Sequence, residues 1–283
     1  MLKDIDDMPS YRTSSLFHFT KEPGVLLKIL ETGVIPNYCL EDLSYFNRKL
    51  NVGVPMISFC DIPLTRTSMF KARYGEYAIG LSKEWALKKQ INPILYVNDE
   101  RILVSLGFLR AYYRTLDDEV KARGGSETSI SFDLLSQKSL EGIKAFINRS
   151  NAKDAVYSLM GYMKRYQSKG PDGSDQINYI ENEWRYVVTG EDIDWKWSLD
   201  EYEKWRGKGD KPEPSEALKR QKLTFNVEDI THIIVKTDSE VHHIVDAILR
   251  MRNIGGIEGA LSDDERKLLL TKIISQEKIE KDF

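Results

Sequence analysis

Polar and apolar residues alternate most clearly over residues 178–188. A period of two, with aromatic and β-branched residues among the apolar positions, predicts a strand. In such a strand Glu181, Glu183 and Arg185 lie on one face, and the two carboxylates are about 7 Å apart along the chain. A face of this composition is either a salt-bridged, solvated sheet surface or the wall of a polar cleft.

Similar spacings predict the other elements. Strands are expected at residues 15–20, 57–62, 75–82, 92–97, 223–225 and 230–235. Helices are expected at residues 25–30, 65–74, 83–90, 102–113, 134–149, 152–167 and 239–252. Residues 37–51 are expected to be irregular or weakly helical. Gly33 should end the first helix, and Ser82 should N-cap the third.

This pattern predicts one α+β domain over residues 1–283 with three additions. A helical insertion at 99–167 interrupts the β-rich pattern, and 261–283 reads as a charged C-terminal helix. Residues 191–222 are charged, rich in tryptophan and broken by glycine and proline. That segment is expected to be a helical flap packed on the domain, with a lid that carries aromatic contacts as the alternative.

Composition limits the function. There are 41 basic and 44 acidic residues, a net charge of -3, so the whole chain is no polyelectrolyte, although a local basic groove stays open. The two cysteines lie in apolar segments and are expected to be reduced, and no metal-ligand spacing occurs. The start is polar and no apolar run approaches roughly 20 residues, so a cytoplasmic protein without a membrane segment is expected. Phosphate-loop, dinucleotide and nucleophile-elbow motifs are absent from the sequence.

Three polar positions on predicted strands suggest one chemistry: His18 with Thr20, Ser58, and the Glu181–Glu183 pair. Cleavage of the N-glycosidic bond of NAD passes through an oxocarbenium-like state, which a carboxylate stabilises while it binds the ribose 2′-hydroxyl. A histidine on a neighbouring strand could anchor the other ribose. The simpler alternatives stay open: a strand-edge histidine, and favourable helix-end charge for the Lys164, Arg165 and Lys169 group.

The run Leu16-Phe17-His18-Phe19-Thr20, with the leucines and Gly33 that follow it, resembles the start of DarT-like ADP-ribosyltransferases. The segments 57–63, 74–85 and 181–185 resemble the AbiGi abortive-infection family more closely. Together these likenesses cover about 15–97 and 178–245, and leave out the helical block.

The resemblance implies an ADP-ribosyltransferase-like fold, a split and bent sheet that holds NAD in its cleft. It implies Glu183 as the catalytic glutamate, with Glu181 and Arg66 in supporting catalytic roles. The residues implied to contact NAD are His18, Phe19, Thr20, Ser58, Tyr74 and Tyr77. NAD would be a substrate, and no metal is implied.

The first functional hypothesis is therefore an NAD-dependent mono-ADP-ribosyltransferase toxin of phage defence. Arg66, Lys71 and Arg73 would meet a nucleic-acid acceptor, and the neighbouring aromatic residues suit single strands. A protein acceptor, a plain NAD glycohydrolase, and an inactive transferase-like antitoxin are the alternatives. A toxin of this kind would need a neutralising partner.

Overall fold

The computed structural model describes residues 13–44, 49–109, 111, 149–169, 173–190, 192–207, 209 and 212–282. The expected helix at 134–149 falls almost wholly outside these residues, as does most of the expected insertion at 99–167. Within the described residues, no helix has the length and apolar character needed to cross a membrane.

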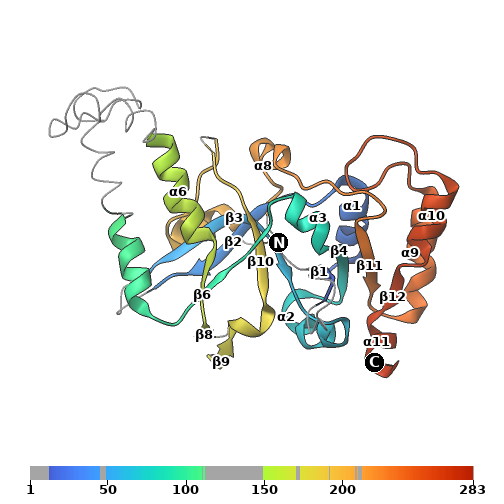
Figure 1. Cartoon of the computed structure of the whole chain (residues 1–283), viewed down its shortest axis with the longest axis horizontal. Coiled ribbons are helices and arrows are strands. Elements are labelled where there is room, and N and C mark those ends of the chain that lie inside the picture. Colours follow the sequence, from blue (N-terminus) through green and yellow to red (C-terminus); the bar gives the residue numbers. More distant parts are fainter. Residues whose placement is uncertain are drawn as a thin grey trace, which may run out of the picture.

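A mixed sheet of eight strands forms the centre of the molecule (Figure 1). Its order is β12 (Ile273–Ser275), β11 (Ile230–Val235), β4 (Tyr77–Ser82), β1 (Ser15–Thr20), β3 (Asn51–Cys60), β10 (Glu183–Val187) and β5 (Asn92–Pro93), and β2 (Asn37–Asp42) also pairs with β3. Only β11 and β12 run parallel; the other neighbours are antiparallel. The α+β prediction is confirmed at this level.

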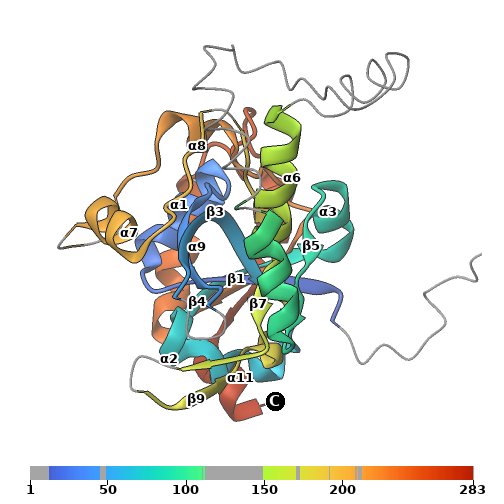
Figure 2. The same cartoon turned by 90° about the vertical axis from the view of Figure 1, so that its left-hand side faces the viewer.

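The sheet opens along β3, which curves along its length (Figure 2). One edge of β3 pairs with β10, from Glu183 opposite Cys60 to Val187 opposite Met56. The pairing continues past β10, where Val188 N donates to Pro55 O and Gly53 bridges to Lys196. The opposite edge is shared by two strands: β2 pairs with the start of β3, and β1 meets it only where Phe17 faces Cys60. Between these contacts β1 and β2 diverge, and that divergence creates space beside the middle of β3.

Helices cover both faces of the sheet. The main core packs α1 (Pro23–Thr32), α3 (Lys83–Lys88), α9 (Val241–Arg250) and α10 (Asp263–Leu270) on the side that carries Leu16, Phe59 and Ile233. Strand alternation sends the neighbouring residue, Phe17, to the other face, where η2 (Leu64–Phe70), α2 (Lys71–Tyr74) and α11 (Gln276–Asp282) lie. The expected caps are confirmed: α1 ends at Gly33, and the Ser82 hydroxyl accepts from Trp85 N.

Several shorter elements complete the described chain. They are α6 (Arg149–Gly161), β6 (Leu95–Val97) beside β7 (Met163–Arg165), β8 (Gln167–Lys169) beside β9 (Asp175–Ile177), η3 (Asn178–Glu181), α7 (Leu199–Arg206), α8 (Glu216–Arg220) and η4 (Asp238–Glu240). In the flap segment Trp195 and Tyr202 are buried, and Tyr202 packs with Tyr38 and Val188.

The structure corrects six predictions about the elements and their boundaries. The strand expected at 178–188 starts only at Glu183, because η3 and a left-handed Asn182 (φ 43°) precede it. Residues 37–42, expected to be irregular, form β2, and the helix expected to reach 167 ends at Gly161. The strand expected at 92–97 is divided into β5 and β6, and the C-terminal helix is interrupted by β12. Of the strand expected at 223–225, Leu223 forms a single bridge to Val34.

Candidate functional site

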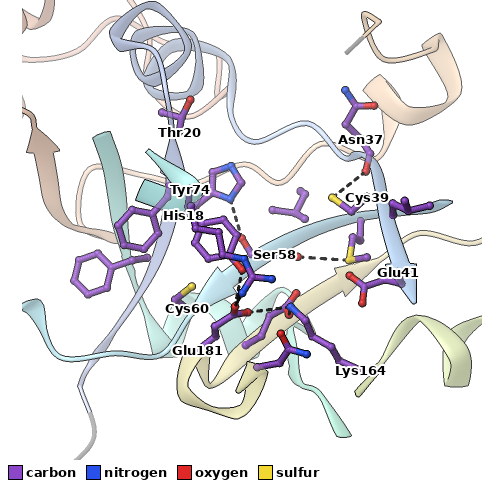
Figure 3. A pocket seen from close by; sticks show the side chains of 18 of the residues that line it. His18, Thr20, Asn37, Cys39, Glu41, Ser58, Cys60, Tyr74, Lys164 and Glu181 are labelled. Carbon is purple, nitrogen blue, oxygen red and sulfur yellow. Dashed lines mark hydrogen bonds and ion pairs between the residues drawn. The ribbon is translucent and has the colours of Figure 1, made fainter. Parts of the chain in front are cut away.

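A cavity of about 670 Å³ occupies the opening between β1 and β2 (Figure 3). His18 and Glu183, which the sequence predicts to face one crevice, both line it. The other predicted site residues that line it are Phe19, Thr20, Ser58, Tyr74 and Glu181. In Figure 3, His18 lies on the β1 side and Glu41 on the β2 side, with Glu181 and Lys164 below them.

Two predicted site residues do not line this cavity. Arg66 lies on η2 with an exposed side chain. Tyr77 is buried elsewhere, where its hydroxyl donates to Glu240 Oε1 at 3.1 Å, and burial together with this bond raises its pKa to about 12. Neither side chain is placed to hold a ligand in the opening.

A hydrogen bond to β3 orients the His18 side chain, although the backbone of His18 does not pair with that strand. Its Nδ1 lies 2.8 Å from the carbonyl oxygen of Ser58, in the gap between β1 and β2. Because a carbonyl only accepts, Nδ1 carries the proton and donates. The ring also packs 5.6 Å from the ring of Phe59. The imidazole is therefore fixed by one hydrogen bond and one aromatic contact.

Glu183 is an ion-paired carboxylate at the start of β10. Arg185, two residues along the same strand face, donates from Nε to Oε1 (2.6 Å) and from Nη2 to Oε2 (3.1 Å). Lys164 on β7 donates to Oε2 at 2.9 Å, and Glu183 is only 4% exposed. Burial opposes ionisation, but Arg185 and Lys164 outweigh it and lower the pKa of Glu183 to about 2.

Glu181 reaches the same place from the η3 turn rather than from a strand. Its Oε1 accepts from Arg73 Nη1 (2.5 Å) and from the Tyr74 hydroxyl (2.7 Å), and its Oε2 accepts from Lys164 (2.9 Å). Burial and the Glu181 charge raise the pKa of Tyr74, so the phenol remains a donor. Glu181 itself is 1% exposed.

A third carboxylate, Glu41 on β2, closes the network. Arg185 Nη2 lies 2.9 Å from Glu41 Oε1, and Arg185 also donates to the carbonyl oxygens of Gly161 (2.7 Å) and Met163 (3.3 Å). Burial raises the pKa of Glu41, while Arg185 and Lys164 act against that rise. We call the three glutamates with Arg73, Lys164 and Arg185 the ionic network. It links β2, β7 and β10 through groups that are mostly buried.

Sequence reasoning missed one member of the ionic network, Glu41, and placed another, Lys164, on the wrong kind of element. Lys164 was interpreted as a helix-end charge, yet it lies on β7, and Glu41 fell in a stretch expected to be irregular. Arg73, expected to meet an acceptor phosphate, pairs with Glu181 and lines the cavity, while Lys71 pairs with Glu280. The one usable signal was the strand spacing of Glu183 and Arg185, which put both on one face.

The cavity wall carries both charged and neutral groups, and its basic residues are Arg73, Lys164, Arg165 and Lys169. His18, Thr20, Asn37 and Ser58 bring hydrogen-bonding groups to the cavity wall, beside apolar side chains such as Phe19. The carboxylate oxygens of Glu181 and Glu183 already accept from cations. Among the residues that the structure describes, no group of three or more histidine, cysteine, aspartate or glutamate side chains could hold a metal ion.

Comparisons with known proteins agree with part of this picture. The family model described as abortive phage resistance protein AbiGi, antitoxin, matches residues 32–236. The abortive phage resistance protein AbiGi of Lactococcus lactis subsp. cremoris is 24% identical over 269 residues, covering 88% of this chain and 99% of the relative. No solved structure matches, so the ADP-ribosyltransferase fold stays a prediction. Because the family model spans well over half of the sequence, the chain belongs to the AbiGi family of abortive phage resistance proteins.

Proposed function

We propose that the chain is the antitoxin of an abortive-infection pair, a binding protein that neutralises a partner toxin rather than an enzyme. The observation that carries the proposal is the ion pairing of Glu183. Arg185 donates to both of its carboxylate oxygens, Lys164 donates to Oε2, and the residue is buried. The antitoxin description of the family supports the same role and implies a protein partner.

The physical reason lies in what a transferase asks of its glutamate. Cleavage of the glycosidic bond of NAD needs a carboxylate that accepts the ribose 2′-hydroxyl and faces a developing positive charge. At Glu183 two cations stand within about 3 Å of the oxygens. Their charge would oppose a ribosyl cation, and a hydroxyl would have to displace one of them. This arrangement suits a structural ion pair better than a catalytic group.

Growth in bacterial cells tests the proposal. Expression of the chain alone is expected to leave growth unchanged, and its co-expression with the toxin of the same system is expected to restore growth that the toxin alone arrests. Toxin with an empty vector is the control. Arrest by the chain alone, or failure to protect although the chain is soluble and folded, would contradict the antitoxin role.

A second candidate keeps the NAD chemistry. The specific observation in its favour is that His18 and Glu183 line one cavity of about 670 Å³. In this candidate a ligand first displaces Lys164 or Arg185 from Glu183. The N-glycosidic bond of NAD then breaks, nicotinamide leaves, and ADP-ribose passes to a nucleic acid, or to water in a glycohydrolase. Labelled NAD incubated with cell DNA, RNA and protein tests it. Label on a macromolecule supports transfer, label only in free ADP-ribose supports hydrolysis, and unchanged NAD contradicts both.

A further inference from the structure

The η3 turn that buries Glu181 also presents an exposed apolar surface. Ile177, Tyr179 and Ile180 are 48%, 51% and 51% exposed. The Tyr179 ring stacks on Tyr166 at 5.5 Å between centroids and meets the edge of Tyr96 at 5.2 Å. We call these five residues the tyrosine patch. Figure 1 shows the neighbouring β8–β9 pair at the lower margin of the molecule, away from α8 and α10.

The patch is held in place by buried groups at both ends of the turn. Asn178 is buried; its backbone N–H donates to Tyr166 O (2.8 Å), and its side chain donates to Arg165 O (2.9 Å). At the other end Glu181 is fixed in the ionic network. With both ends anchored inward, the two residues between them, Tyr179 and Ile180, are directed outward. A surface that is already ordered loses little conformational entropy when it binds.

The turn then ends in a way that fixes this geometry further. Asn182 adopts a left-handed conformation (φ 43°), which asparagine tolerates better than most residues. Directly after it, Glu183 N donates to the Tyr96 hydroxyl at 2.7 Å. Tyr96 thus links the patch to the first residue of β10, so its ring is positioned by the backbone that begins the strand.

The side chains of the patch favour a protein as its occupant. Two isoleucines offer aliphatic area that bases cannot stack on, while tyrosines are enriched where protein interfaces concentrate their binding energy. Nucleic acid would need cations for its phosphates. The neighbouring Lys169 pairs instead with Asp175 at 2.7 Å, and Lys164 and Arg165 pair with glutamates. An apolar centre beside already neutralised charges matches an apolar protein surface.

We propose that the tyrosine patch is the docking surface for the partner toxin, which covers it with apolar side chains of its own. This inference rests on the antitoxin function proposed above and adds the place of contact. Contiguous exposed apolar groups that are rigidly held are typical of interaction sites.

Affinity for the purified toxin of the same system tests the inference. Tyr179→Ala and Ile180→Asp are each expected to weaken binding by at least about tenfold, as measured by calorimetry. Leu249→Asp is the matched control: Leu249 is 52% exposed on α9, away from the patch, and its substitution should leave the affinity unchanged. Ile177→Ser provides a milder variant should Ile180→Asp fold poorly, and thermal unfolding checks each protein.

The outcomes separate the two proposals. If the wild type binds the toxin and the patch variants that fold bind equally tightly, the docking surface is overturned while the antitoxin function stands. If the folded wild type neither binds nor neutralises the toxin, both proposals fail together. Patch variants that still bind the toxin but no longer self-associate would assign the patch to a second copy of the chain. Variants that still bind the toxin but lose oligonucleotide binding would assign it to nucleic acid. Either result would overturn the toxin-docking proposal.

Discussion

Glu181 and Glu183 share one ammonium group, since each accepts a hydrogen bond of 2.9 Å from Lys164 Nζ. Two neighbouring buried carboxylates repel each other unless a cation lies between them. Burial opposes the charge on Lys164, but Glu183, Glu41 and Glu181 outweigh it and raise its pKa above 10.5. Lys164 is therefore positively charged throughout the physiological pH range, and the ionic network depends on it.

Removal of this cation should be strongly destabilising. Lys164→Met keeps a side chain of similar length but leaves Glu181 and Glu183 without their shared partner, so a loss of about 3–5 kcal/mol in the free energy of unfolding is expected. Urea denaturation measures it. Lys169→Met removes an exposed lysine paired with Asp175 and should cost no more than about 1 kcal/mol. Equal losses in the two variants would contradict the importance of the ionic network.

Acid should weaken the fold through Glu183. The pKa of this carboxyl falls from 4.5 to about 2 on folding, so the unfolded chain binds the proton more readily. The stability that Glu183 contributes is fully present above pH 4.5 and is lost as pH falls toward 2. Unfolding free energies measured across this window should decline less steeply in Glu183→Gln than in the wild type.

The sign for Glu41 is opposite, and this separates the two glutamates. Because the pKa of Glu41 is raised on folding, the folded protein binds this proton before the unfolded chain does, so the contribution of Glu41 to stability grows as pH falls toward 4.5.

Glu258→Gln, at an exposed carboxyl outside the ionic network, is the control for Glu183→Gln and should follow the wild-type profile. A Glu183→Gln profile parallel to the wild type below pH 4.5 would count against the assigned ion pairing.

Gly161 marks a close approach between α6 and the sheet. A Cβ there would lie 2.6 Å from Val187 Cγ1 and 3.1 Å from the Trp195 ring, so Gly161→Ala should lower the unfolding free energy by about 1–3 kcal/mol. Gly24→Ala in α1 meets no atom within 4 Å and should be neutral or stabilising by up to about 1 kcal/mol. Thermal melting of the two variants gives the comparison, which fails if Gly161→Ala is as stable as Gly24→Ala.

NAD binding tests the cavity directly. If the second candidate function holds, the wild type binds NAD, and His18→Ala weakens binding by about tenfold through loss of a hydrogen-bonding group. His243→Ala, on the exposed side of α9, is the control. Fluorescence or calorimetric titration measures both. An affinity that is the same in wild type and His18→Ala would remove His18 from the site.

Local patterns sufficed for much of the fold. Strand β1 could be predicted because Leu16 and Phe17 alternate toward two separate apolar clusters, and α3 because Ser82 supplies its cap. Strand β2 could not be predicted from its residues. Its Glu41 is buried beside Arg185, which is distant in sequence and lies 2.9 Å from Glu41 Oε1. When the partner of a buried charge lies on another strand, the sequence around that charge reads as a polar loop.

The site was predictable in outline but not in its charges. The strand period placed Glu183 and Arg185 on one face. Strand β1, which carries His18, and strand β10, which carries Glu183, border one cavity as expected. Helix α6 ends at Gly161, a glycine of the kind that commonly closes a helix, and the sequence prediction passed over that signal. Because the helix was expected to continue to residue 167, Lys164 was placed on a helix instead of facing Glu183.

The η3 turn has consequences in two directions, because its inner residue Glu181 and its outer residue Tyr179 share one short stretch of backbone. A molecule that enters the cavity and breaks the Arg73–Glu181 ion pair would change the conformational energy of the η3 backbone. A protein that binds Tyr179 would change the energy of the same backbone. Thermodynamic linkage then requires the cavity ligand to change the affinity for the protein by the same factor as the protein changes the affinity for the cavity ligand. A titration of one in the presence of the other would then measure a single coupling constant, whichever is added first.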